Sequence, residues 1–358
     1  MNLIVMLQGV GINERGWAKL ASNFGRVVLI QQGYIIHVEI WENGQRLFNG
    51  PNVRVTRWRK LDEVLFGMPT AIRVLFLTLK HTQKQPIDVI VATNYHCSLV
   101  AMLLKRFGKA RKVVPFLTDF MPIRGSWLLR QHRRITGWLM RFVARRSDEV
   151  WILSPRIPTG RTDDKSFVVP ICINEFQSPP RLRDEVAYIG YPSKDHALDI
   201  LFDIARRHKL RLNIIGDSPY LHSVRHLAPP DAAFHGLMND EERIGQILSR
   251  CFCGYCIYWD ITPSSYSYYG FPSKTLYNFA SNVPIVITNV AYFNRNFEDR
   301  GVGRVVDPDP QKIEEAILQL KSQYPRFSAA IDRFRKDWNQ HVLDFHRQRL
   351  KALGCRVE

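Results

Sequence analysis

The chain lacks an apolar run long enough to form a membrane-spanning helix. None of its stretches approaches the roughly 20 uninterrupted apolar residues that a span requires, which excludes an integral membrane protein of the helical type. No basic region precedes the apolar residues of the N-terminal MNLIVMLQGV, which leads directly into a strand-like pattern. We therefore expect no secretory signal and a cytosolic location.

Cysteine is scarce as well, and its spacing suggests no disulfide framework. Six cysteines occur in the chain, and Cys251, Cys253 and Cys256 share one short segment. Thiols this close together invite a zinc site, but no second Cys or His pair follows at the spacing that zinc sites use. Their neighbours Phe252 and Tyr255 favour a buried strand, in which free cysteine is a small apolar side chain. We expect no metal and a reducing compartment.

Acidic residues are few relative to basic ones. The chain has 50 Lys and Arg against 33 Asp and Glu, a formal net charge of +17, which calls for a polyanionic neighbour. Nucleic acid, an anionic membrane face and diphosphate substrates are the candidates. The aromatic residues do not follow the pattern of a single-strand-binding module, and the densest group of arginines lies in one segment, so we expect no nucleic-acid partner.

That segment, residues 124–146, contains seven arginines, two tryptophans and no acid. Arginines and apolar residues each recur at helical spacing, which predicts a basic amphipathic helix. Such a helix could lie in the interface of an anionic membrane, or its apolar stripe could pack in a domain core, and both interpretations stay open. The residues expected to face a membrane are Trp127, Arg130, Arg134, Trp138 and Arg141.

A second apolar surface is expected over residues 61–80. Gly67 and Pro69 interrupt this segment, which predicts two short helical pieces or a membrane-facing hairpin.

Strand and helix patterns alternate along the chain, which predicts an α/β fold. The length of 358 residues suggests two domains, and the polar segment 172–185, with its paired prolines, is typical of an interdomain linker. We expect a first domain over 1–172 and a second over 173–325. The C-terminal helix over 326–358 could pack back on the first domain or within the second.

The first domain opens with an apolar strand, a loop that contains Gly9 and Gly11, a helix and a second strand. The third glycine of a dinucleotide fingerprint is missing, so these glycines either let a substrate approach the backbone or simply form a tight turn. Two later strands end near Ala92 and Thr118, which predicts that His96 and Asp119 lie at the same edge. A histidine or carboxylate there can take a proton from a hydroxyl group, although both residue types are also ordinary in loops and turns.

In the second half, strand, loop, helix and strand follow one another over residues 185–215. The carboxyl ends of parallel strands meet at one edge of a sheet, where ligands collect. The residues expected at this edge are Gly190, Lys194, Gly216, Asp217, Ser273 and Lys274.

Residues 269–307 are typical of loop, helix, strand, helix and strand, with Lys274 at the end of the loop. A Gly-Phe-Pro-Ser-Lys loop that opens a helix offers backbone N–H groups, a positive helix end and an ammonium group, which together suit a diphosphate. Pro and Ser are also common helix starters without any ligand, and most lysines are solvated surface residues. The sequence therefore leaves an anion site and ordinary packing both open.

The segment PSKTLYNFASNVPIVIT resembles the donor-side motif of glycosyltransferase family 4, in which a loop, a helix and a turn precede a Val/Ile strand. The two positions at which that family usually has glutamate fall on Tyr269 and Tyr277. A phenol can hydrogen-bond to a donor but carries no charge near pH 7. SDEVWILSPRI is similar to the family's last strand before the interdomain linker.

This resemblance implies the GT-B fold, in which two Rossmann-like domains face each other across a cleft. It implies a nucleotide-diphosphate sugar bound through Lys194 and Lys274, with Gly9 and Gly11 on the side of a glycan or lipid-linked acceptor. It also implies transfer with retention of configuration, without a required metal, in surface or exopolysaccharide synthesis at the inner face of the cytoplasmic membrane. Because tyrosines replace both glutamates, a protein that binds nucleotide sugar or another polyanion without turnover is the alternative.

Overall fold

The protein is described by a computed structural model that divides into two units. Unit 1 comprises Met1–Ile171 and His341–Glu358, and unit 2 comprises Cys172–Gln340. The described residues are 2–356 except 10–12, 33–34, 51–52, 55–67, 83–84, 94, 119–126, 177–182, 239, 261, 263–264, 266–267, 270–271 and 290–294.

Unit 1 is built on a sheet with nine strands among these residues, in the order β4-β3-β2-β1-β6-β7-β8-β9, with β5 paired to β3. The parallel strands are β1 (Leu3–Gly9), β2 (Arg26–Gln32), β6 (Ile87–Thr93), β7 (Ala110–Leu117), β8 (Val150–Ile152) and β9 (Ser166–Val168). An antiparallel extension adds β3 (Ile35–Glu42), β4 (Gln45–Asn49) and β5 (Val53–Arg54) beyond β2. The central strands are apolar because both faces of the sheet are covered.

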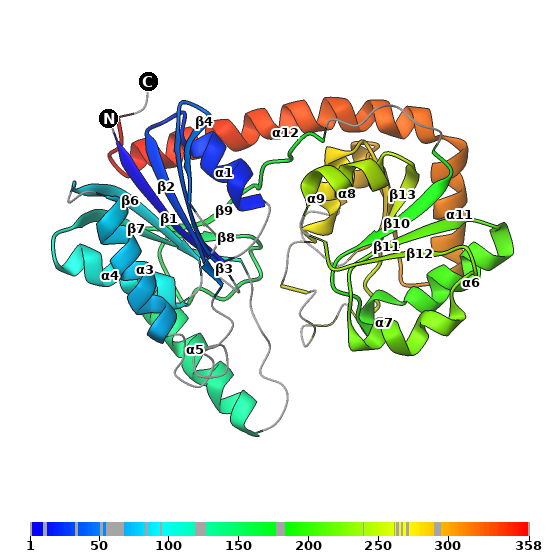
Figure 1. Ribbon diagram of the computed structural model, residues 1–358, viewed down its shortest axis with the longest axis horizontal. Coiled ribbons are helices and arrows are strands. Elements are labelled where there is room, and N and C mark those ends of the chain that lie inside the picture. Colours follow the sequence, from blue (N-terminus) through cyan, green and yellow to red (C-terminus); the bar gives the residue numbers. More distant parts are fainter. Residues whose placement is uncertain are drawn as a thin grey trace. The chain divides into compact units, whose positions relative to one another are not determined.

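Helices cover both faces of this sheet. Figure 1 shows α3 and α4 on one face, and α1 with the end of α12 on the other. Val74 of α3 and Val100 of α4 belong to the same buried cluster as Val5 and Val28 of the central strands. The helices of unit 1 are α1 (Asn13–Ala21), α3 (Met68–His81), α4 (Tyr95–Arg106) and α5 (Trp127–Arg146).

Two expectations for unit 1 change in detail. Residues 68–81 form one continuous helix, because Pro69 stands in its first turn, where the missing N–H costs nothing. The preceding part of the 61–80 segment lies outside the described residues. The antiparallel strands β3 and β4 were not expected, since no strand–turn–strand pattern was identified over residues 35–49.

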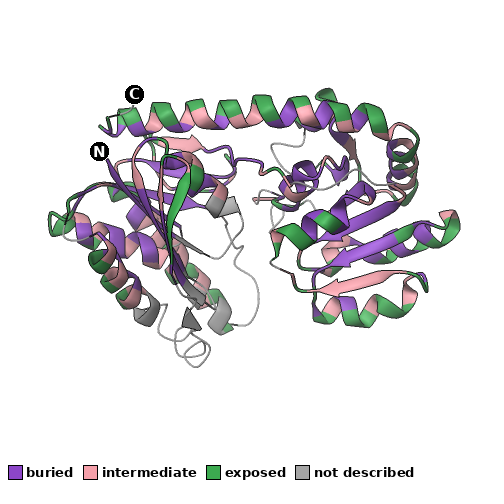
Figure 2. Cartoon of the chain, turned by 45° about the horizontal axis from the view of Figure 1, so that its top comes forward, coloured by how far each residue is buried: buried purple, intermediate pink, exposed green. Residues whose placement is uncertain are grey.

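Unit 2 contains a six-stranded parallel sheet in the order β12-β11-β10-β13-β14-β15. This is the doubly wound order 3-2-1-4-5-6, numbered within the unit. Strands β10, β13 and β14 are buried along their length, and Figure 2 shows buried strands inside this sheet. The strands are β10 (Glu185–Ile189), β11 (Arg211–Ile215), β12 (Ala233–Gly236), β13 (Cys251–Cys256), β14 (Ile285–Thr288) and β15 (Gly303–Val306).

Helices α6 and α11 pack on one face of the second sheet, with α8 and α9 on the other (Figure 1). Helix α11 begins where Asp309 accepts a hydrogen bond from the Lys312 N–H and Pro310 occupies the first turn. The helices are η2 (Lys194–His196), α6 (Leu198–His208), α7 (Pro219–Val224), η3 (Arg225–Leu227), α8 (Glu241–Leu248), α9 (Lys274–Ala280), α10 (Arg295–Asp299) and α11 (Pro310–Ser322).

The α/β fold class expected from the sequence is confirmed in both units. The buried strand expected around the three clustered cysteines is β13, in which every residue is buried. All six cysteines are free and buried, and burial raises the pKa of the Cys256 thiol to about 12, so it stays neutral near pH 7. None of the helices in the described parts of the chain has the length and apolar character of a membrane span.

Helix α12 (Tyr324–Ala352) contributes to both units, and a histidine anchors its end in unit 1. His346 is fully buried, and its ring lies edge-on to the rings of Trp17 and Trp151. The Nε1–H of Trp17 donates to Nε2 of His346, and the Nδ1–H of His346 donates to the carbonyl oxygen of Val342 at 2.7 Å. The imidazole is therefore held in its neutral form, and burial lowers its pKa to about 4.

We expect unit 1 to lose stability as the pH falls from about 6.5 to about 4. The folded protein binds the His346 proton more weakly than the unfolded chain, so this stability is complete above the unfolded pKa and is lost through this window. The loss should approach about 3 kcal/mol. Urea unfolding at pH 7 and pH 4.5 measures it. His346→Gln, which does not titrate, should flatten this part of the profile, and an unchanged profile in that variant would contradict the assignment.

Candidate functional site

The strand order of unit 2 creates a point at which ligands can reach the sheet. Strand β10 pairs with β11 on one side and with β13 on the other, so the connections leave in opposite directions at β10 and β13. Loops that follow two such strands diverge and leave space at the carboxyl edge. A candidate site of unit 2 is therefore sought where β10 and β13 end.

Four side chains meet at this point, and we call them the Lys274 cluster: Tyr188, His196, Tyr258 and Lys274. The ammonium nitrogen of Lys274 lies 4.3 Å from the ring centroid of Tyr258 and 4.9 Å from that of Tyr188. The His196 ring lies 5.5 Å from the Tyr188 ring and 5.1 Å from the Tyr258 ring. The cluster thus joins residues from β10, from the loops after β10 and β13, and from the start of α9.

Lys274 is only 7% exposed, and its Nζ has no hydrogen-bond partner in the described part of the chain. Burial is the main reason why the pKa of its ammonium is lowered to about 8, while the charge of Asp195 acts in the opposite direction. The sequence placed this lysine at the site but did not indicate that it is buried.

His196 supplies an uncharged ring beside this cation. Its Nδ1 accepts a hydrogen bond of 3.1 Å from the Ser193 N–H, and the Ser193 hydroxyl lies 2.9 Å from the same nitrogen. In the neutral ring the proton is then on Nε2. Burial, assisted by the charge of Lys274, lowers the His196 pKa to about 2. The sequence analysis missed this residue, although it stands two positions after Lys194 in the same loop.

Backbone contacts fix the loops that carry the cluster. The Thr288 hydroxyl bonds both the N–H and the carbonyl oxygen of Tyr258, at 2.9 Å each, and so ties this loop to the end of β14. The Asp195 carbonyl accepts a 2.6 Å bond from the Trp259 N–H, and its carboxylate accepts one from the Asp260 N–H. The turn after β10 and the segment after β13 therefore hold each other in place.

Contacts at both ends position α9, the helix that begins with Lys274. The Asn278 amide donates to the Lys274 carbonyl within the helix at 2.8 Å, and its oxygen lies only 2.2 Å from the place that a Cβ on Gly254 would take, so α9 lies close against β13. At the other end, Arg335 of α12 donates to the carbonyl oxygens of Phe279 and Ala280, each at 3.4 Å. Because α9 has seven residues, we assign the charge of the site to Lys274 and not to the helix end.

The N–H groups at the start of α9 are partly used within the turn. Those of Thr275 and Leu276 donate to the carbonyls of Pro272 and Ser273. Ser273 itself is exposed, as is Lys194 on η2, so the two lysines expected to act together differ in burial.

The glycines predicted at the edge close their strands. Gly190 and Gly216 follow β10 and β11 with φ angles of +129° and +144°. A Cβ on Gly216 would lie 1.8 Å from the Gly190 carbonyl oxygen, so the two loops touch backbone to backbone. Asp217 is exposed and lies 3.0 Å from His222.

The two tyrosines at the expected glutamate positions are half-buried. The ring of Tyr269 lies 5.1 Å from that of Tyr268, and the ring of Tyr277 lies 6.3 Å from that of Phe176. Tyr277 belongs to the same short helix as Lys274.

In unit 1, the parallel strands β1 and β6 are neighbours and mark its own change of direction. Gly9 is the last residue of β1. His96 lies in the first turn of α4 and not in the loop before it, half-buried with its ring 5.1 Å from that of Tyr95. Asp119 and Gly11 lie outside the described residues. Gly9 at the end of β1 and His96 just after β6 thus belong to adjacent strands.

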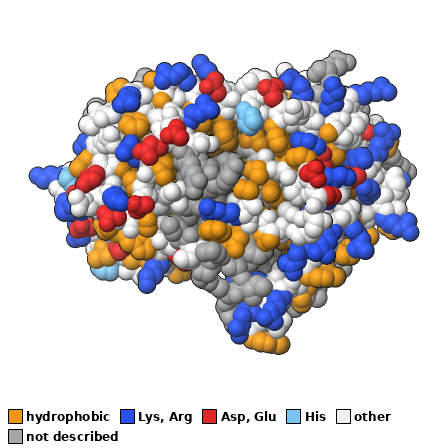
Figure 3. All heavy atoms as spheres, turned by 180° about the vertical axis from the view of Figure 1, so that it is seen from behind, with side chains coloured by type: hydrophobic (Ala, Val, Ile, Leu, Met, Phe, Trp, Pro, Cys, Tyr) orange, Lys and Arg blue, Asp and Glu red, His pale blue; other side chains and the backbone are white. Residues whose placement is uncertain are grey.

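The basic segment forms the single helix α5, as predicted. Trp127, Arg130, Arg134 and Trp138 are exposed, while Arg141 is half-buried with its methylenes close to Gly160. Figure 3 shows basic and hydrophobic side chains gathered at the lower edge of that view, over α5. Helix α3 also exposes apolar side chains, namely Ile72, Phe76 and Leu79.

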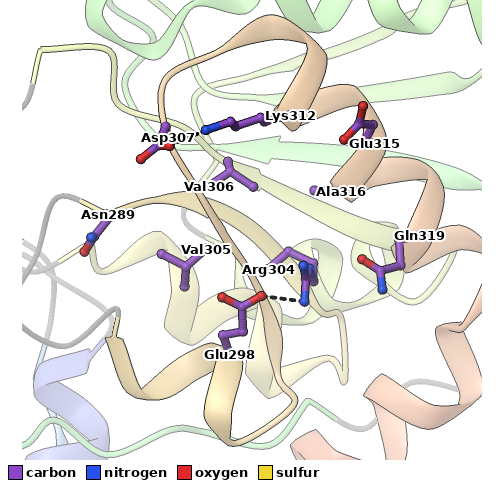
Figure 4. A pocket seen from close by; sticks show the side chains of 10 residues that line it. All are labelled: Asn289, Glu298, Arg304, Val305, Val306, Asp307, Lys312, Glu315, Ala316 and Gln319. Carbon is purple, nitrogen blue, oxygen red and sulfur yellow. Dashed lines mark hydrogen bonds and ion pairs between the residues drawn. The ribbon is translucent and has the colours of Figure 1, made fainter.

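A pocket of about 600 Å³ lies along β15, at the outer edge of the second sheet (Figure 4). Both of its cations are paired, Arg304 with Glu298 and Lys312 with Asp307. It includes one residue of the Asp-x-Asp triplet at 307–309, which the sequence analysis passed over and whose Asp309 caps α11. Among the described residues no group of three or more His, Cys, Asp or Glu gathers as metal ligands would.

Gly216→Ala should destabilise unit 2 by about 3 kcal/mol or more, because the methyl group would collide with the Gly190 carbonyl. Gly236→Ala is the matched control. Gly236 also has a positive φ, +67°, but nothing lies within 4 Å of the added Cβ, so only backbone strain of about 1–2 kcal/mol is expected. Urea unfolding of both variants compares them. Equal losses would show that the close contact between the two glycine loops is not important.

The chain is similar to known proteins both in sequence and in fold. Residues 20–158 match the family model described as "Glycosyl transferase 4-like domain". Among curated proteins, none matches the chain by sequence. Of the two segments that suggested this family, PSKTLYNFASNVPIVIT lies in unit 2, whereas SDEVWILSPRI lies in unit 1 within the residues that the family model matches.

Solved structures match nearly the whole chain. Sucrose-phosphate synthase from Thermosynechococcus elongatus has a TM-score of 0.67 at 13% identity, with 98% of this chain and 100% of that chain covered. HepE from Anabaena, in complex with UDP-glucose, has a TM-score of 0.63 at 14% identity over 99% of each chain. The UDP-forming trehalose-phosphate synthase from Burkholderia xenovorans has a TM-score of 0.62 at 14% identity, covering 99% and 98%. The resemblance and the fold class predicted from the sequence are confirmed: this chain has the GT-B fold, and its residues 20–158 are similar to the glycosyl transferase 4-like family.

Proposed function

We propose that this protein is a glycosyltransferase that moves a sugar from a nucleotide-diphosphate donor to a glycan or lipid-linked acceptor in surface or exopolysaccharide synthesis. The observation that carries the proposal is the buried ammonium of Lys274, which has no hydrogen-bond partner among the described residues, at the point where the strand order of unit 2 reverses. A diphosphate is the polyanion that GT-B enzymes bind in their second domain. UDP is the first nucleotide to test, because HepE from Anabaena, with the same fold, was solved with UDP-glucose.

In the proposed reaction the protein has two tasks: it positions the substrates and stabilises charge on the leaving group. The acceptor hydroxyl oxygen forms a bond to the anomeric carbon while the bond from that carbon to the diphosphate breaks, and the diphosphate leaves with the electron pair. Lys274 stabilises the negative charge that grows on the leaving group. With Lys194, which is exposed in the same loop as His196, it forms the basic side of the donor site.

The roles of His96 and Asp119 depend on which group takes the proton of the acceptor hydroxyl. We propose transfer with retention of configuration, in which the departing diphosphate takes the proton and His96 and Asp119 orient the substrates. The position of His96 in the first turn after β6, next to the strand that ends at Gly9, supports a role at the acceptor. NMR of the product formed from an α-linked donor separates the two outcomes, since an α-glycosidic bond means retention and a β-glycosidic bond means inversion.

The tyrosines at 269 and 277 favour a second candidate function. A phenol gives a sugar or ribose hydroxyl one hydrogen bond, where a carboxylate gives a charge-assisted one. A protein that keeps the donor site but has lost turnover would bind a nucleotide sugar without consuming it. Release of UDP from a UDP-sugar, measured with and without acceptor membranes, distinguishes this candidate from the enzyme.

We also propose that unit 1 attaches peripherally to the inner face of the cytoplasmic membrane. Helix α5 exposes two tryptophans beside arginines, and exposed tryptophan is costly unless it meets an apolar phase. Each arginine near anionic lipid adds about 1 kcal/mol, while tryptophan rings favour the headgroup region. A membrane-bound acceptor would account for this surface.

Lys274→Ala should weaken UDP binding by about 10- to 100-fold, because the ligand loses a charge-assisted hydrogen bond in a buried place. Calorimetric titration and the rise in melting temperature with UDP measure the loss. Lys312→Ala is the matched control, since Lys312 is already paired with Asp307 in the pocket beside β15. UDP affinity that survives in Lys274→Ala would remove Lys274 from the donor site. Absence of binding by the unaltered protein to UDP, GDP and their sugars would refute the function itself.

Replacing Trp127 and Trp138 by serine should reduce co-sedimentation with vesicles that contain anionic lipid, while leaving UDP affinity unchanged. The exposed rings are lost from α5, but unit 2 is untouched. Leu237→Ser, which removes an exposed apolar side chain from unit 2, is the control. Equal binding of neutral and anionic vesicles, or none at low salt, would contradict the membrane proposal.

A further inference from the structure

The ammonium of Lys274 is held by aromatic rings and not by oxygen atoms. The Tyr258 and Tyr188 rings lie 4.3 and 4.9 Å from Nζ, within the range over which a ring face attracts a cation. In the part of the chain that the structure describes, no carbonyl, hydroxyl or carboxylate accepts its protons. A ring stabilises the charge but leaves all three N–H donors available.

Another buried cation of unit 2, Arg335, differs from Lys274 in its hydrogen bonds. Arg335 is 6% exposed, much like Lys274. Its guanidinium nevertheless donates to Asn282 at 3.0 Å and to Glu175 and Asp332 at 2.9 Å each. Buried donors in folded proteins are paired in this way because an unpaired one loses its hydration without compensation. Lys274 has no such partner among the described residues, and an anionic ligand would supply one.

Most of the groups that face Lys274 from the neighbouring elements carry no negative charge and so cannot pair with its ammonium. Tyr188 comes from β10, Tyr258 follows β13, and both are neutral phenols near pH 7. The Cys256 thiol of β13 and the His196 imidazole of η2 are also neutral, since burial raises the pKa of the thiol to about 12 and lowers that of the imidazole to about 2. Among the described residues, Asp195 is the carboxylate whose charge raises the Lys274 pKa. Its carboxylate also accepts a hydrogen bond from the backbone N–H of Asp260.

We propose that Tyr188 and Tyr258 are positioning residues that hold the Lys274 ammonium without a hydrogen-bond partner, so that the donor diphosphate becomes its first anionic ligand. This inference rests on the proposed function and specifies how the same site works. A carboxylate partner would compete with the phosphate and would have to be displaced. Aromatic rings keep the cation in place and need not release it when the ligand arrives.

Binding of a diphosphate should change the protonation of Lys274. Without ligand, burial lowers the Lys274 pKa to about 8, so near pH 8.5 a large part of the free protein carries a neutral amine. A bound diphosphate favours the charged form and raises that pKa. Binding at pH 8.5 should therefore be accompanied by proton uptake, whereas at pH 6.5 the lysine is already protonated and little uptake is expected.

The test is calorimetric titration of the full-length protein with UDP at pH 6.5 and pH 8.5, each in two buffers of different ionisation enthalpy. The dependence of the heat on the buffer gives the number of protons taken up. The unaltered protein and Tyr258→Phe, which keeps the ring, should both take up protons at pH 8.5. Tyr258→Leu should bind UDP about tenfold more weakly, with a larger loss at pH 8.5 than at pH 6.5.

The possible results separate this inference from the function on which it rests. UDP binding by the unaltered protein without proton uptake at pH 8.5 would overturn the inference and leave the donor site intact, and this holds even if the leucine variant does not fold. So would equal affinity of the leucine and phenylalanine variants. Failure of the unaltered protein to bind UDP at either pH would instead reject the proposed function.

Discussion

The candidate site depends on the burial of one ammonium group. A cation removed from water must be stabilised by its surroundings, and here the stabilising groups are two aromatic faces and a distant carboxylate. Such a place can exist only where loops diverge above the sheet, which the reversed strand order at β10 and β13 provides. The chemistry of the site therefore follows from the topology of the second sheet.

Much of unit 2 serves to keep this arrangement rigid. Glycines allow β10 and β11 to end with their loops in backbone contact, and Gly254 lets α9 lie close against β13. Arg335 joins the carboxyl end of α9 to helix α12, which continues into unit 1.

The sequence was most informative where structure is local. The apolar runs of β1, β6, β10 and β13, and the amphipathic pattern of α5, were each recognised because period and burial are properties of neighbouring residues. The sequence analysis missed β3 and β4, although Asn43 and Gly44, both with positive φ, form the two-residue Asn-Gly turn that is typical of a hairpin. His196 was missed for a different reason, since nothing in its immediate neighbourhood indicates a buried ring.

The sequence by itself determined the alternation of strands and helices outside the antiparallel strands of unit 1, the resemblance to glycosyltransferase family 4 and the presence of a lysine after a Pro-Ser turn. Only the tertiary structure decided which lysine is buried and what surrounds it. Tyr188, His196, Tyr258 and Lys274 come from four separate segments, and their contacts exist only once the sheet has brought these segments together. Burial, and with it the lowered pKa of Lys274, is a property of that assembly and not of any one segment.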